Sequence, residues 1–298
     1  MCRHLAYLGP PVPLAALVLD PQHSLYEQSW APHDMRGGGT VNADGFGLAW
    51  YPDPTQPLPG SPSSTPASST PAIPVPATAA TTTAAPGTPA PAIPVSELPA
   101  RPDSSSPLRY RRNVPIWADD NLRDLAAGIT SGAVIAAVRN GTDRMPHDES
   151  AVAPFRSGNW LFSHNGRIPG WPESTVKLAE QLPVAELLTL GAPVDSALLF
   201  ALITHRLASG EDPAEAVASV VHDVEAAAPG SRLNVLLTDG AQVVATTWTH
   251  SLWVRRTPDS TTVSSEPFGI GHWDEVPDRS LLVATATTLS ITPMEGPQ

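Results

Sequence analysis

Hydrophobic positions along this 298-residue chain follow two different periods. Short apolar or alternating runs of strand length occur near the beginning, in the middle and throughout the last quarter of the chain. Longer runs with helical spacing lie between them. The pattern therefore predicts a protein that combines strands with helices. Strands are expected at residues 2–9, 45–51, 133–139, 160–164, 232–238, 242–247, 252–255, 261–264 and 281–286.

Three helices are expected, at residues 119–127, 195–209 and 213–228. The third has explicit boundary signals, since Asp212 suits the N-cap and Pro213 suits the first helical position. Adjacent helices followed by consecutive strands are typical of helices layered on antiparallel sheets. The sequence thus predicts an α+β fold.

Residues 52–107 interrupt this pattern, because they are almost entirely Pro, Ala, Ser and Thr and include no aromatic side chain. Such a stretch cannot bury enough apolar surface to offset the entropy lost on ordering. The residues before it are too few to fold alone, so the strand at 45–51 is expected to pair with a later strand. We therefore expect one domain over residues 1–298 with a disordered insertion, and not two domains joined by a linker.

Composition narrows the possible functions. The net charge is −12 and the only basic cluster is Arg109, Arg111 and Arg112, so nucleic acid is not an expected partner. The apolar N-terminal stretch is interrupted by prolines and is shorter than the ~20 residues that span a bilayer, so neither a signal peptide nor a membrane anchor is expected. One cysteine and no Cys/His pairs at ligand spacing predict neither a disulfide nor a metal site. A cytoplasmic protein without a cofactor fits these features.

The single cysteine, Cys2, directly follows the initiator Met1. Removal of Met1 would leave a thiol and a free α-amine on one residue. Their unperturbed pKa values are about 8.5 and about 7.7 to 8.0, so both groups exchange protons near neutral pH. An N-terminal cysteine therefore needs no histidine from elsewhere to act as a nucleophile. The alternative, a small buried apolar residue, is the more common fate of a free cysteine.

Three polar stretches at strand ends or turns contain residues suited to holding a charged, amino-acid-like group near Cys2. They are residues 42–45 (NADG), 139–142 (RNGT) and 164–166 (HNG). Taken singly, an Asn-Gly pair after an apolar strand indicates only a tight turn. Asp195 precedes a predicted helix, where its simplest role is that of an N-cap.

Together these residues resemble the class II glutamine amidotransferases, N-terminal-nucleophile enzymes that attack the γ-amide of glutamine. The resemblance rests on Cys2, the Arg-x-x-Thr of residues 139–142, the His-Asn-Gly of residues 164–166 and Asp195, and it spans nearly the whole chain outside the insertion. Within the family, the chain is most similar to the ergothioneine-pathway hydrolases, in which Arg replaces the Gly that usually follows the nucleophile. The similar stretches are MCRHLAYLG, LVLDPQHSLYEQSWAP, NADGFGLAWY, WLFSHNG, DSALL, RLNVLLTDG, ATTW, SEP and VPDR.

The resemblance implies a four-layer αββα fold with two stacked antiparallel sheets. It also implies that the Cys2 thiolate attacks the γ-carbonyl carbon to form a glutamyl thioester, while the α-amine moves the proton. The side-chain amide of Asn165 and the backbone N–H of Gly166 would form the oxyanion hole.

The resemblance likewise assigns the groups that would bind substrate. Arg139, with Thr142, would bind the glutamyl α-carboxylate, and Asp195 would accept from the α-ammonium. Capping and substrate binding by Asp195 could coexist on different oxygens. Asp143 stands where many members have His, which puts an anion near the predicted site for the substrate α-carboxylate. The Asp143 side chain must therefore point away from this site, or Arg139 and Thr142 bind the carboxylate more weakly than in those members.

The implied reaction is hydrolysis of the γ-glutamyl amide of γ-glutamyl-hercynylcysteine sulfoxide, a small-molecule substrate, with no membrane partner and an oligomeric state that stays open. One alternative is a glutaminase that supplies ammonia to a synthase. Another is a non-enzymatic binding protein, which would have no need for nucleophile, oxyanion donors and clamp together. Trp30 is a candidate contact for the trimethylammonium of the leaving group, although a packing role is the more common one for Trp.

Overall fold

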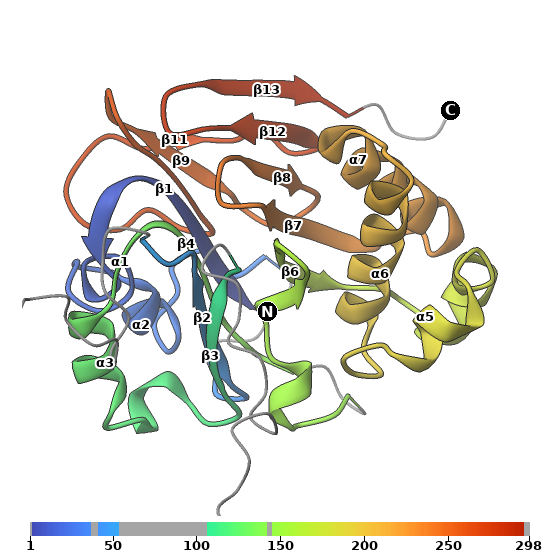
Figure 1. Cartoon of the computed structure of the whole chain (residues 1–298), viewed down its shortest axis with the longest axis horizontal. Coiled ribbons are helices and arrows are strands. Elements are labelled where there is room, and N and C mark those ends of the chain that lie inside the picture. Colours follow the sequence, from blue (N-terminus) through green and yellow to red (C-terminus); the bar gives the residue numbers. More distant parts are fainter. Residues whose placement is uncertain (1, 37–40, 54–105, 142–144, 295–298) are drawn as a thin grey trace, which may run out of the picture.

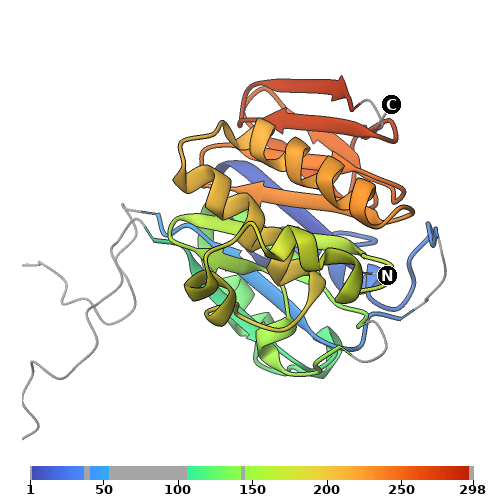
Figure 2. The same ribbon diagram turned by 90° about the vertical axis from the view of Figure 1, so that its right-hand side faces the viewer.

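Two antiparallel sheets stack face to face at the centre of the structure, and helices cover both outer faces (Figures 1 and 2). The computed structural model describes residues 2–36, 41–53, 106–141 and 145–294. The apolar side chains fall into three clusters, one between the sheets and one under each helical layer. The predicted α+β class and αββα layering are confirmed.

The first sheet has seven strands and is built around the N-terminal strand. In spatial order they are β11 (Asp274–Glu275), β9 (Trp253–Arg256), β10 (Thr261–Ser264), β1 (Arg3–Pro13), β4 (Thr130–Val138), β2 (Phe46–Trp50) and β3 (Leu108–Arg112). The β4 sequence is nearly all apolar because this strand is buried on both faces. Its end lies beside the beginning of β1, where Val138 pairs with Arg3.

The second sheet has six strands. In spatial order they are β13 (Leu289–Pro293), β12 (Ser280–Ala284), β8 (Val243–Thr247), β7 (Arg232–Thr238), β6 (Trp160–Arg167) and β5 (Phe155–Ser157). Ala6 and Ile135 of the first sheet belong to the same buried cluster as Leu161 and Leu236 of the second. This contact places the beginning of β1 opposite β6.

The outer layers are helical. α6 (Asp195–Ala208) and α7 (Pro213–Ala227) pack on the second sheet. The Asp212 side chain accepts hydrogen bonds from the first turn of α7, so the predicted cap is confirmed; such a cap is worth about 1 kcal/mol. The first sheet is covered by α1 (Ala15–Val18), α2 (Leu25–Gln28) and α3 (Leu122–Gly128). The remaining helical segments are α4 (Val176–Ala179), α5 (Val184–Leu188) and the 3-10 turns Ile116–Ala118, Glu149–Ala151 and Glu173–Thr175.

The strand before the insertion pairs with strands after it, as the sequence predicts. β2 lies between β4 and β3, and Trp50 at its end pairs with Leu108 at the beginning of β3. The chain therefore leaves and re-enters the same sheet at neighbouring positions. Most of the predicted insertion, residues 54–105, lies outside the described residues. Within the described part of the chain, none of the helices has both the length and the apolarity needed to cross a bilayer.

Candidate active site

Cys2 stands immediately before β1, beyond the point where strand pairing begins. Its side chain is partly buried, and its Sγ lies 3.8 Å from the carbonyl oxygen of Asn140 in the loop after β4. The thiol thus faces the predicted RNGT stretch. The small cavity beside Cys2 is lined by Ala137, Val138, Arg139, Ala151, Ala153, Phe155, Ser163, His164 and Ser196.

A contact between the two sheets joins the beginning of β1 to β6. His4 Nδ1 lies 3.1 Å from Ser163 Oγ, which joins β1 to β6. Side chains two residues apart on a strand project to the same face, so the Asn165 side chain is on the face of Ser163, and Cys2 directly precedes β1. The predicted nucleophile and the predicted oxyanion donor therefore belong to the two chain segments that this contact joins.

The side-chain amide of Asn165 is fully buried, yet neither Nδ2 nor Oδ1 has a hydrogen-bond partner among the described residues. A buried polar group left unpaired costs roughly 1–3 kcal/mol. A ligand oxygen at this point would supply the missing acceptor. An amide held without a protein partner is the arrangement that an oxyanion hole requires.

The HNG stretch is not a turn, which corrects the sequence-based prediction. β6 continues through Arg167, and Gly166 pairs with Leu233. A Cβ on residue 166 would lie 1.8 Å from the carbonyl oxygen of Arg232. The glycine is required by this close approach of two backbones. His164 is anchored by Ser196 Oγ at 3.0 Å and by the carbonyl oxygen of Arg232 at 2.8 Å.

Arg139 follows β4, as predicted, and is braced by the NADG stretch. Its backbone N–H donates to Gly45 O at 2.7 Å and its carbonyl accepts from Asp44 N–H at 3.0 Å. Gly45 has a φ of +135°, a conformation that L side chains rarely adopt. Arg139 as a whole is 9 % exposed, and its Nη1 has no partner among the described residues. A buried cation with an unused donor is suited to a carboxylate ligand.

The NADG stretch itself has a supporting role in the structure. The Asp44 carboxylate accepts from Gly141 N–H at 2.7 Å, and Asn42 Nδ2 lies 3.4 Å from the carbonyl oxygen of Ser29. These contacts hold the loop that carries Arg139. Neither Asn42 nor Asp44 lines the cavity beside Cys2.

Asp195 is the first residue of α6, and the N-cap position belongs to Val194, so the simple capping role is wrong. Its carboxylate accepts from Ser196 N–H at 2.7 Å and from Ile168 N–H at 3.1 Å. Ser196 lines the cavity beside Cys2, whereas Asp195 lines a larger neighbouring cleft with Arg167 and other residues. Thr142 and Asp143 lie outside the described residues.

Buried imidazoles surround the beginning of β1. Burial lowers the pKa of His4 to about 3, helped by the nearby His164, His250 and Arg3. Burial, Arg232 and Arg3 likewise lower the pKa of His250 to about 3. Both rings are therefore uncharged at neutral pH.

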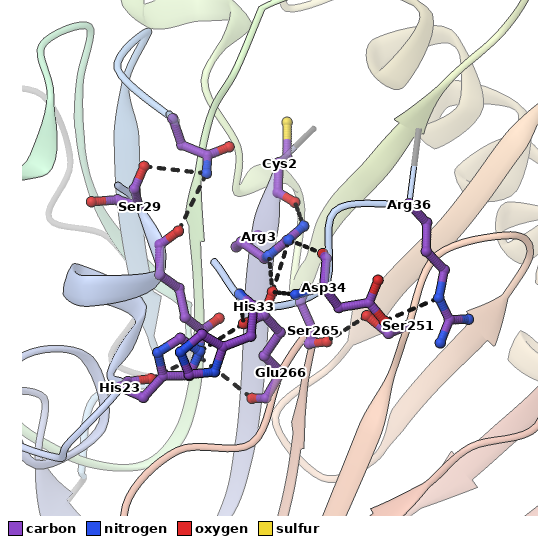
Figure 3. Close-up of polar contacts among 12 residues, drawn as sticks. Cys2, Arg3, His23, Ser29, His33, Asp34, Arg36, Ser251, Ser265 and Glu266 are labelled. Atoms are coloured by element: carbon purple, nitrogen blue, oxygen red, sulfur yellow. Dashed lines mark hydrogen bonds and ion pairs between the residues drawn. The ribbon is translucent and has the colours of Figure 1, made fainter. Parts of the chain in front are cut away.

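Two residues without a predicted role lie directly behind the nucleophile. Arg3 and Glu266 form an ion pair at 2.8 Å with both side chains almost completely buried (Figure 3). The available signal was a charged residue inside an otherwise apolar strand, together with the SEP stretch that contains Glu266. Trp30, in contrast, packs edge to face against Tyr26 and Trp117 and does not line the cavity beside Cys2.

Comparisons with known proteins show the family of the chain. No protein-family model matches the chain. It is 32 % identical over 295 residues to the γ-glutamyl-hercynylcysteine sulfoxide hydrolase of Mycolicibacterium smegmatis, covering 99 % of this chain and 100 % of that protein. It is 31 % identical over 296 residues to the Mycobacterium tuberculosis protein of the same name, covering 99 % and 97 %.

The chain belongs to the class II glutamine amidotransferase family, in the group of the γ-glutamyl-hercynylcysteine sulfoxide hydrolases. A solved glutamine aminotransferase class-II domain protein from Silicibacter pomeroyi has the same fold, with a TM-score of 0.59 and 21 % identity over 99 % of this chain and 100 % of that one. Membership of this family, with its fold, makes the chain an amidohydrolase.

Proposed function

We propose that the chain hydrolyses the γ-glutamyl amide bond of γ-glutamyl-hercynylcysteine sulfoxide, releasing glutamate and hercynylcysteine sulfoxide in ergothioneine biosynthesis. Relatives with 31–32 % identity over 99 % of the chain carry the name of this activity. The enzyme would act in the cytoplasm as one domain, with residues 52–107 as an insertion.

One observation carries the proposal: Cys2 and Arg139, whose Nη1 has no partner among the described residues, line one cavity, and the unpartnered Asn165 amide is next in sequence to His164 of the same cavity. Buried donors without protein acceptors are costly, so such groups call for a ligand. A γ-glutamyl substrate supplies an α-carboxylate for Arg139 and a carbonyl oxygen for Asn165.

The chemistry begins after removal of Met1. The α-amine of Cys2 takes the thiol proton, directly or through water, and sulfur forms a bond to the γ-carbon. The resulting oxyanion accepts hydrogen bonds from Asn165 Nδ2 and Gly166 N–H. The carbon–nitrogen bond then breaks as the amine returns the proton to the leaving nitrogen. Water adds to the thioester, which releases glutamate and restores the thiol.

Selectivity for the glutamyl group follows from pairing each of its charges with an opposite one. Arg139 binds the α-carboxylate through its planar fork, and Thr142 adds a hydroxyl donor. Asp195 accepts from the α-ammonium. Oδ1 of Asp195 accepts from the backbone N–H and the hydroxyl of Ser196, whereas Oδ2 accepts only from Ile168 N–H among the described residues and has capacity for a second hydrogen bond.

The test compares two amides as substrates for the purified, Met1-processed protein. We expect kcat/KM for γ-glutamyl-hercynylcysteine sulfoxide to exceed that for glutamine, with glutamate formed in equal amount to hercynylcysteine sulfoxide. A preference for glutamine, measured as ammonia release, would contradict the proposal and favour the ammonia-supplying glutaminase. Loss of both activities in Cys2→Ala is the control that assigns turnover to this chain.

A further inference from the structure

A buried ion pair contacts the peptide group of the nucleophile. Arg3 Nε donates to Glu266 Oε1 at 2.9 Å, and both side chains are at most 2 % exposed. From the same guanidinium, Nη1 donates to the carbonyl oxygen of Cys2 at 3.2 Å. Figure 3 shows the Cys2 carbonyl directed toward Arg3 and the sulfur directed away from it. The pair thus supports Cys2 from behind and leaves the thiol free to face the cavity.

Glu266 is held in its charged form by several donors. Its carboxylate accepts from the backbone N–H groups of His33 at 2.9 Å and Asp34 at 3.0 Å, and lies 2.6 Å from His23 Nε2. Burial acts to raise the pKa of Glu266, but the hydrogen bond from His23, the backbone donors and the charge of Arg3 together lower it to about 2. The carboxylate is therefore ionised at neutral pH.

The same pair also fastens the chain around residue 34. Arg3 Nη2 donates to the carbonyl oxygen of Asp34, while Glu266 accepts from the N–H of that residue. One ion pair thereby joins the beginning of β1, the segment at residues 33–36 and the chain that follows β10. All three segments meet behind Cys2.

A metal site is the other arrangement that this cluster suggests, since donor atoms of His23, His33 and Glu266 lie within 4.8 Å of one another. The two imidazole rings stack face to face, with centroids 3.8 Å apart and planes 5° apart. Imidazole lone pairs lie in the ring plane, so stacked rings direct them side by side and not toward one point. Glu266 also already pairs with Arg3. The cluster is built to hold a carboxylate.

Cys2 needs such support because it lies outside the strand ladder and at the end of the processed chain. Terminal residues are poorly ordered unless they are tied down. A bond to the Cys2 carbonyl restricts rotation about the Cα–C bond, and that rotation sets where the α-amine and the thiol point. The contact from Arg3 therefore controls the relative placement of the two reacting groups and the substrate.

We infer that Glu266 is a positioning residue for the nucleophile: through Arg3 it holds the Cys2 peptide so that amine and thiol face the substrate carbonyl together. The inference rests on the proposed function, because it requires Cys2 to be the nucleophile. It assigns Glu266 no contact with the substrate. Misplacement of a reacting group by about 1 Å can lower the reaction rate about a hundredfold. Loss of the Glu266 contact is therefore expected to lower kcat.

Three variants separate positioning from stability. Glu266→Gln removes the carboxylate that pairs with the buried Arg3 charge and lowers the unfolding temperature. The double variant Arg3→Gln/Glu266→Gln removes both charges, so most of the decrease in unfolding temperature is recovered. Arg3→Lys keeps a positive charge for Glu266 but lacks the planar fork that also reaches the Cys2 carbonyl. Asp223→Asn is the matched control, since Asp223 pairs with Arg206 at 2.7 Å on the helical layer.

Kinetics with γ-glutamyl-hercynylcysteine sulfoxide then decide the question. We expect kcat to fall by about one to two orders of magnitude in every Arg3 and Glu266 variant, with KM changed less than about threefold, and the Asp223→Asn control to match the wild type. Intact mass and iodoacetamide labelling of the only thiol verify that Cys2 is processed and present.

Recovery of kcat together with stability in the double variant would overturn the inference and leave the pair a purely structural role. Wild-type kcat in Arg3→Lys would do the same. Failure of the proposed function looks different, since the wild-type protein would then prefer glutamine to this substrate, or Cys2→Ala would retain its turnover.

Discussion

The Asp44 carboxylate accepts a hydrogen bond from the backbone N–H of Gly141 at 2.7 Å, across 97 residues of sequence. This contact braces the loop that carries Arg139, the residue that we propose binds the glutamyl carboxylate. Asp44→Ala should therefore raise KM for the γ-glutamyl substrate by about tenfold, in line with the worth of a hydrogen bond to a charged group. Asp278→Ala is the control, because it removes a similar bond, to Thr249 N–H at 2.8 Å, outside the Cys2 cavity. An unchanged KM in Asp44→Ala would show that the loop does not need this brace.

Asn165 and Asn234 pair across β6 and β7 but have opposite environments. Asn234 Oδ1 accepts from the N–H groups of Trp248 at 2.8 Å and His250 at 3.1 Å, whereas the Asn165 amide has no partner in the described structure. Asn165→Ala should lower kcat by about 10² to 10³ without loss of stability.

Asn234→Ala provides the contrast, with a loss of roughly 1–3 kcal/mol in the free energy of unfolding for each donor left unpaired. Steady-state kinetics and urea unfolding of the two variants test this division of roles. Wild-type kcat in Asn165→Ala would remove Asn165 from the oxyanion hole.

The buried histidines predict how stability depends on pH. His4 has a pKa of about 3 in the folded state, chiefly through burial, against about 6.5 when unfolded. The unfolded state therefore binds more protons below pH 6.5, and stability is lost as the pH falls toward 3. At pH 5 the loss from His4 is about 2 kcal/mol relative to neutral pH.

Urea unfolding at pH 7 and pH 5 measures this loss. His4→Gln should reduce the difference between the two pH values, whereas His272→Gln, on the exposed surface, should leave it unchanged. Glu266 does not contribute to the change in stability between pH 7 and pH 5. Its folded-state pKa is lowered from 4.5 to about 2, so it affects stability only below about pH 4.5. An undiminished pH dependence in His4→Gln would show that His4 is not the group responsible.

The insertion should be dispensable for catalysis. Its two ends continue from Trp50 and Leu108, which pair on neighbouring strands, so a short Gly/Ser loop can bridge them. Replacement of residues 54–105 by such a loop should leave kcat/KM within about twofold of the full-length value, because a shorter loop changes mainly the entropy of closure. A folded variant that loses activity would show that the insertion contributes to the site.

The predictable parts of the fold are those with strong local signals. β7 was placed at its observed bounds, and α7 was located by Asp212 and Pro213. β3 was missed because only Leu108 and Tyr110 of its sequence, LRYRR, are apolar, and so short an alternation among arginines does not identify a strand; it is a strand because it pairs with β2. α1 and α2 have four residues each, too few to establish a helical period.

The residues of the site also fall into those that have a local sequence signal and those that lack one. Cys2 and Arg139 were found from residue type and position, and the structure places both on one cavity. The supporting contacts were not found, because Arg3 and Glu266 are 263 residues apart and a charge pair leaves no local pattern. The bracing role of Asp44 was hidden for the same reason. Sequence therefore indicates the chemical groups, whereas the contacts that orient them depend on tertiary structure.

The central claim is that Cys2 carries the glutamyl group during turnover. Rapid mixing of the Met1-processed protein with γ-glutamyl-hercynylcysteine sulfoxide, acid quenching and mass spectrometry of the N-terminal peptide test it directly. We predict a glutamyl thioester on Cys2 that forms and decays at rates compatible with kcat, and its absence from Cys2→Ala and from protein that retains Met1. Full turnover without this adduct, or by Cys2→Ala, would contradict the account.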